Sequence, residues 1–73
     1  MAHEVYAELV ANVLKVTAQA GDKVGPEDTL LLLESMKMEI PVAAEVEGTV
    51  TEIAVNEGDV VTEGDLLAVV NET

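Results

Sequence analysis

The sequence predicts an all-β fold, a flattened β-sandwich built from two similar halves that a hairpin joins. Two observations lead to this fold class. First, the halves match without gaps at an offset of 37 residues, so that Gly21-Asp22 corresponds to Gly58-Asp59. Second, the sequence is nearly palindromic about Met36-Lys37. Two equivalent β-rich halves in a short chain are typical of a pseudo-two-fold sandwich.

Composition favours narrow strands in one domain spanning residues 1–73. The chain has 73 residues, no cysteine and an apolar content of 49%, and that apolar fraction is supplied almost wholly by Val, Leu, Ala and Ile. Tyr6 is the only aromatic residue. A chain this short has room for a single core, which must close-pack small branched side chains.

The charge balance excludes several classes of partner. Fifteen acidic residues against three lysines give a formal net charge of −12. Such a surface repels nucleic acid, anionic lipid and other copies of itself, so we expect a soluble monomer. No run of 18 apolar residues and no secretion signal is present, which predicts a cytoplasmic protein without a membrane span.

Four β-rich runs are expected outside the central segment. They cover residues 5–10, with Tyr6 and Glu8 outward, and residues 13–16, 52–55 and 66–70. Clusters of Gly, Asp and Pro between these runs predict turns. His3 precedes the first run and is expected to lie in a frayed terminus. No cysteine or second histidine is available to complete a metal site with it.

Residues 27–40 are locally ambiguous between helix and strand. Leu, Glu, Met and Lys are good helix formers, and Pro26 suits a helix N-terminus. The repeat, however, aligns residues 30–35 with residues 67–72, where Val69-Val70 favours a strand. We therefore expect strands here, with Pro41 on an edge strand because proline cannot donate a ladder hydrogen bond.

The palindrome predicts a two-residue hairpin turn at Met36-Lys37. In that register Leu33 faces Ile40, Glu34 faces Glu39 and Ser35 faces Met38. Tight turns of this kind prefer Asn-Gly, because both central residues adopt positive φ. Met36-Lys37 breaks this preference, and such violations concentrate at functional sites.

The segment Glu-Ser-Met-Lys-Met-Glu-Ile-Pro lies between two Gly-Asp-x-Val repeats. With these flanks it resembles the biotinyl domain of biotin-dependent carboxylases, and is similar to the small biotin/lipoyl attachment proteins. The resemblance covers nearly the whole chain and implies the barrel-sandwich hybrid fold. It also implies a carrier protein of the biotin carboxyl carrier type, not an enzyme.

The resemblance further implies that Lys37 carries covalent biotin, attached by a biotin protein ligase. Met36 and Met38 would contribute to recognition, although flexible apolar filling of the turn is an alternative. A biotin carboxylase and a carboxyltransferase, acting from separate chains, would load and unload the carboxyl group. The sequence departs from the pattern at Glu27, where the second half has Gly64, so the two turns need different backbone conformations.

Other functions remain open at this point. Lipoyl domains share the fold, but their lysine typically follows Asp and precedes Ala, so Met36 and Met38 favour biotin. An unmodified β-sandwich interaction protein is a second alternative. An acidic cation-binding protein is disfavoured because Asp22, Asp59 and Asp65 lie in ordinary turn contexts, and we expect no metal. With one histidine and no cysteine, no catalytic residues are predicted.

Overall fold

The computed structural model describes residues 1–73 as eight β-strands and contains no helix. Consequently, no helix of a length and apolarity able to cross a membrane occurs. The strands are β1 (Ala2–Tyr6), β2 (Ala11–Val16), β3 (Lys23–Val24), β4 (Thr29–Ser35), β5 (Met38–Ala43), β6 (Gly48–Ile53), β7 (Val60–Val61) and β8 (Leu66–Glu72). The all-β prediction is confirmed.

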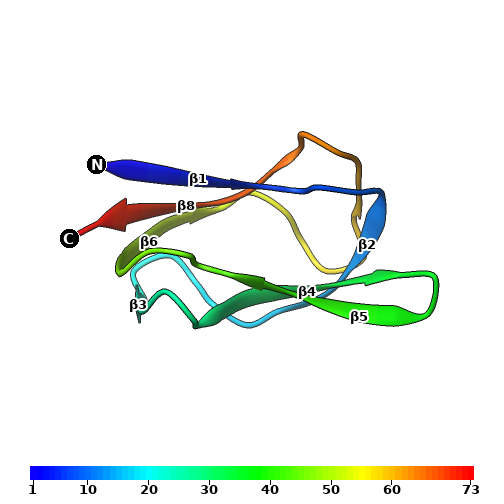
Figure 1. The fold of residues 1–73 in the computed structure, drawn as a ribbon, viewed down its shortest axis with the longest axis horizontal. Helices are drawn as coiled ribbons and strands as arrows, with labels where there is room; N and C mark the ends of the chain where they lie inside the picture. The colour runs from blue at the N-terminus through cyan, green and yellow to red at the C-terminus, as the bar shows by residue number, and fades with distance from the viewer.

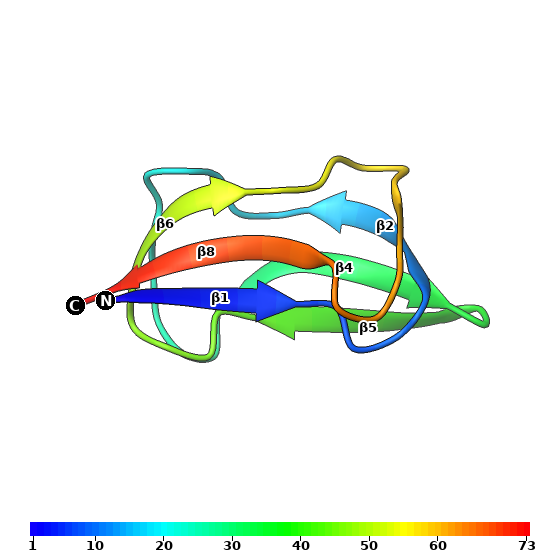
Figure 2. The same ribbon diagram turned by 90° about the horizontal axis from the view of Figure 1, so that it is seen from above.

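Two four-stranded antiparallel sheets form the sandwich, in the orders β1-β8-β6-β3 and β5-β4-β2-β7. The molecule measures 35 × 18 × 17 Å, and its long axis runs from the two chain termini to the β4–β5 hairpin (Figure 1). In the perpendicular view, β1 and β5 run along the same side of the molecule (Figure 2). Each is the edge strand of its own sheet, so Pro41 lies on an edge as predicted.

The repeat of 37 residues is a property of the backbone as well as of the sequence. Adding 37 to the residue numbers converts β2 into β6, β3 into β7 and β4 into β8. The Gly21 amide donates to the Val50 carbonyl (2.6 Å), and the equivalent Gly58 amide donates to the Val13 carbonyl (2.8 Å). These reciprocal bonds cross between the halves, because each short strand (β3 or β7) joins the sheet built mainly by the other half.

Four aspartates hold the turns that the repeat places at matching positions. Each accepts through Oδ2 a hydrogen bond of 2.8–2.9 Å from the backbone amide three residues earlier, at Asp22, Asp28, Asp59 and Asp65. The turn role predicted for these residues is confirmed. Gly64 adopts φ +93°, which a type II turn requires at its third position, whereas Glu27 does not have a positive φ. The two turns therefore differ, as the sequence indicated.

The core contains sixteen buried side chains, all Val, Leu or Ala. Leu30 and its equivalent Leu67 are fully buried, as are Val50 and Val70. A core of small branched residues lets two narrow sheets pack closely. It also anchors β4 through Leu31 and Leu33, which lie on the strand that leads to Lys37.

Several predicted boundaries were wrong. The first strand begins at Ala2 and ends at Tyr6, because the chain there leaves β8 and its Ala7 amide donates instead to the Asp65 carbonyl at 2.8 Å. The predicted strand 13–16 starts at Ala11, and 66–70 continues to Glu72. Of the predicted strand 52–55, only residues 52 and 53 lie in a strand, the last two of Gly48–Ile53.

His3 is not frayed. It lies in β1, is half-buried, and its Nε2 is 3.1 Å from Glu45 Oε1. Pairing of β1 with β8, which the sequence pattern did not contain, orders this residue.

Candidate functional site

The β4–β5 hairpin has the predicted register. Leu33 pairs with Ile40, Glu34 with Glu39 and Ser35 with Met38, which leaves Met36-Lys37 as the two-residue turn. Met36 has φ +53° and Lys37 has φ +66°, the left-handed values that a type I′ turn requires at both central positions. Neither residue is a glycine, so each adopts a left-handed backbone conformation that costs about 1–2 kcal/mol per residue.

The turn projects beyond the sheet that supports it. Pairing between β2 and β4 ends at Asn12 and Glu34, whereas β4 and β5 stay paired through Ser35 and Met38. The turn that joins β4 and β5 lies at the extreme end of the long axis (Figure 1), and Lys37 within it is exposed. The buried Leu33, four residues before it, fixes the direction of the hairpin.

Met36 in the turn and Met38 at the start of β5 both face solvent. Met36 is 89% exposed and Met38 is 61% exposed. The filler interpretation predicts apolar packing, and side chains this exposed have little of it. Large apolar side chains gathered at a protruding tip are instead typical of contact surfaces.

Acidic residues flank the lysine without pairing to it. Glu34 and Glu39 are directly opposite one another across the hairpin, an arrangement of like charges that is itself unfavourable. Lys37 makes no ion pair; the single pair within 4.0 Å in the molecule joins His3 and Glu45. The amine is thus sterically open and unrestrained, and no histidine or cysteine lies nearby in the sequence to act as a base.

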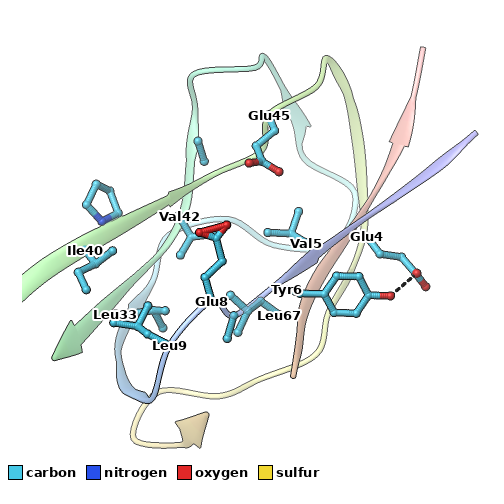
Figure 3. A pocket seen from close by; sticks show the side chains of 13 residues that line it. Glu4, Val5, Tyr6, Glu8, Leu9, Leu33, Ile40, Val42, Glu45 and Leu67 are labelled. Atoms are coloured by element: carbon cyan, nitrogen blue, oxygen red, sulfur yellow. Dashed lines mark hydrogen bonds between the residues drawn. The ribbon is translucent and has the colours of Figure 1, made fainter. Parts of the chain in front are cut away.

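One surface feature had no counterpart in the sequence prediction. A cavity of about 300 Å³ opens between the edge strands β1 and β5, and nine of its thirteen lining residues are hydrophobic (Figure 3). The alternation of Met38, Ile40 and Val42 could have indicated an apolar face on β5, but Pro41 obscured the strand pattern. That β1 would lie beside it depends on tertiary packing and has no local signal.

Comparison with known proteins agrees with this geometry. Residues 1–70 match the family described as "Biotin-requiring enzyme". A relative from Mycobacterium leprae, "Biotinylated protein TB7.3 homolog", is 55% identical over 71 residues, which are 97% of this chain and 100% of that protein.

Two solved structures resemble the fold. The urea carboxylase of Kluyveromyces lactis superposes with a TM-score of 0.91 and 37% identity over 97% of this chain, which spans only 6% of that protein. The lipoyl domain of the 2-oxoglutarate dehydrogenase complex from Azotobacter vinelandii matches with a TM-score of 0.76 and 26% identity, over 93% of this chain and 96% of that domain.

Proposed function

This chain belongs to the family of biotin-requiring enzymes, and we propose that Lys37 is the residue to which its biotin is attached. The domain is a carrier and not itself a catalytic enzyme, and its cofactor is covalently bound biotin. The observation that carries the assignment to Lys37 is its position. It is exposed, free of ion pairs, and placed on the most protruding turn of a rigid sandwich.

The chemistry of attachment suits an exposed amine. A biotin protein ligase would present biotin as an acyl adenylate, and the Lys37 nitrogen would attack the acyl carbon. The new C–N bond forms as the C–O bond to the phosphate breaks, and AMP leaves. Lysine amines are almost fully protonated at neutral pH, so the ligase must also remove a proton. The flanking Glu34 and Glu39 face each other across the hairpin and place negative charge beside the amine.

Exposed Met36 and Met38 are proposed to form the apolar part of the contact with the ligase and with later partners. Thioether side chains are flexible and polarizable, so they adapt to several different surfaces. Both methionines are adjacent to Lys37 in the sequence and are exposed, so a protein that binds at Lys37 can contact them.

We propose that the partners are a biotin carboxylase and a carboxyltransferase acting in trans. Similarity to a urea carboxylase supports a role in carboxyl transfer, and the bound biotin would supply the group that carries the carboxyl. The protein would work as a cytoplasmic monomer, in keeping with its net charge of −12.

Intact-mass measurement tests the attachment site. Protein incubated with a biotin protein ligase, ATP and biotin should gain one biotinyl group, and Lys37→Arg should gain none. Lys15→Arg and Lys23→Arg are matched controls, because these are the other two lysines and both are exposed. Retained modification in Lys37→Arg, or none in the wild type, would reject the proposal. Loading by a lipoate ligase instead would make the domain a lipoyl carrier.

A further inference from the structure

A groove lies between the edge strands β1 and β5. Each of these strands has a hydrogen-bonded neighbour on one side only, β8 for β1 and β4 for β5. The two edges run along the same side of the molecule without pairing to one another (Figure 2). An edge strand leaves the backbone groups of alternate residues unpaired, and these are a template for another strand.

The floor of the groove is apolar. Leu9, Leu33 and Ile40 gather at the end nearer the hairpin, and Val5 and Leu67 form the middle (Figure 3). The volume of about 300 Å³ is at the small end of the range for ligand cavities.

The rim is acidic. Glu8 and Glu45 reach toward one another over the opening, and Glu4 lies at the far side beside Tyr6 (Figure 3). No lysine lines the groove, but Glu45 is paired with His3 and Glu4 accepts from Tyr6, so Glu8 is the rim carboxylate without a partner. An apolar floor under a carboxylate rim is complementary to a segment that alternates apolar and cationic side chains.

The apolar face of β5 connects this groove with the exposed hairpin. Ile40 and Val42 line the cavity, and Met38 follows on the same face because side chains alternate along a strand. A partner bound in the groove would thus extend toward Lys37 without covering it.

We propose that the β1–β5 groove docks an extended segment of a partner protein, with alternating apolar and Lys or Arg side chains. The segment pairs its backbone with β1, since Pro41 deprives β5 of one donor, and inserts its apolar side chains between the sheets. A second copy of this chain is a poorer occupant, because two rims of carboxylates would repel. The assignment is independent of attachment at Lys37.

A short end-blocked peptide of alternating lysine and valine is a suitable probe. Titrated into the ¹⁵N-labelled protein, it should shift the backbone amide resonances of β1 and β5 and leave those of the Met36-Lys37 turn unchanged. Glu8→Lys should weaken binding by roughly three- to tenfold, because it replaces an attraction by a repulsion. Glu52→Lys, an exposed site outside the groove, makes the same change in net charge and should alter binding less than roughly twofold.

Backbone pairing is tested with the same peptide N-methylated at every residue, which keeps the charges but has no N–H group to donate from either strand edge. Its groove shifts should disappear. Shifts spread over the whole acidic surface, equal effects of Glu8→Lys and Glu52→Lys, or no shifts at all would overturn the proposal. Groove shifts that depend on protein dilution would assign the groove to a second copy. Groove shifts produced by biotinylation alone would assign it to the attached group.

Discussion

The end of β4 and the end of β8 are equivalent places in the two sheets, but their neighbours differ. Glu34 has partners on both sides, Asn12 and Glu39, and its equivalent Asn71 likewise has Thr49 and Ala2. One residue later the symmetry fails. Ser35 retains only β5, because β2 pairing has ended.

Glu72, the equivalent of Ser35, remains paired with Gly48 and donates its amide to the Met1 carbonyl at 2.7 Å. The same repeated unit therefore closes its sheet at one end and extends a free hairpin at the other. The free end carries the strained turn and the exposed lysine. The hairpin end of β4 therefore lacks the ladder pair that Glu72 forms with Gly48, and three measurements test the consequences of the difference between the two halves.

The largest effect is expected from Gly48→Ala. A Cβ at Gly48 would lie 2.1 Å from the Asn71 carbonyl oxygen, which is backbone and cannot move aside without separating β6 from β8. We expect a loss of about 3 kcal/mol in the free energy of unfolding, at the upper end for overpacking. In a domain of this size that lowers the melting temperature by roughly 12–24 °C.

Gly25→Ala is the matched control for that experiment. Its Cβ would meet nothing nearer than Asp28 Oδ2 at 3.9 Å, so the change should be within about 0.5 kcal/mol. The residue equivalent to Gly48 in the first half is Ala11, which tolerates its methyl group because no ladder pair forms there with Ser35. If Gly48→Ala were as mild as Gly25→Ala, the extra ladder pair would not distinguish the two ends.

Features encoded by local pattern or by the repeat could be predicted from the sequence. The hairpin register follows from the palindrome, and the turn aspartates follow from matching positions 37 residues apart. The exposed position of Lys37 also follows from its place in a tight turn. Each of these depends on residues close in sequence or on the comparison of one half with the other.

Features that depend on long-range pairing could not be predicted. The exchange of β3 and β7 between sheets, the order at His3 and the groove between β1 and β5 all need contacts between distant residues. The first strand was misplaced for the same reason, since its end is set by the bond from Ala7 to Asp65 rather than by residue type. Attachment at Lys37 is a prediction that mass measurement must test.

The second measurement concerns the turn itself. Replacing Met36-Lys37 by Asn-Gly should raise the free energy of unfolding by about 1–2 kcal/mol, because Asn and Gly adopt positive φ at lower cost. Urea unfolding of the double variant and of Met36→Asn alone gives the two contributions. The single variant keeps Lys37 and its charge between the two glutamates, so it should retain part of the gain in stability. An unchanged or lower stability would mean that the turn stores no strain.

The third and smallest expected effect concerns a difference between β1 and the equivalent strand β5. Tyr6 on β1 corresponds to Ala43 on β5, and its hydroxyl donates to Glu4 Oε1 on the same strand. That hydrogen bond, together with partial loss of solvent and repulsion between two negative charges, raises the pKa of Tyr6 above its ordinary value of 10.0. Because the pKa is higher in the folded state, the protonated phenol contributes stability that is complete below pH 10 and is lost as pH rises through the folded pKa.

Phenolate absorbance reports this titration directly, because Tyr6 is the only aromatic residue. The native protein should titrate at higher pH than the protein in concentrated urea, and Glu4→Gln should reduce the difference by removing the charged acceptor. The free energy of unfolding measured above pH 10 should fall more steeply in the wild type than in Tyr6→Phe. Both proteins contain the same three lysines, so the lysines do not affect the difference between the two curves. Coincident native and unfolded titrations would show that the bond to Glu4 does not persist in solution. In that case neither edge strand would have a stabilising side-chain hydrogen bond along it, and Tyr6 would not contribute to the stability of β1.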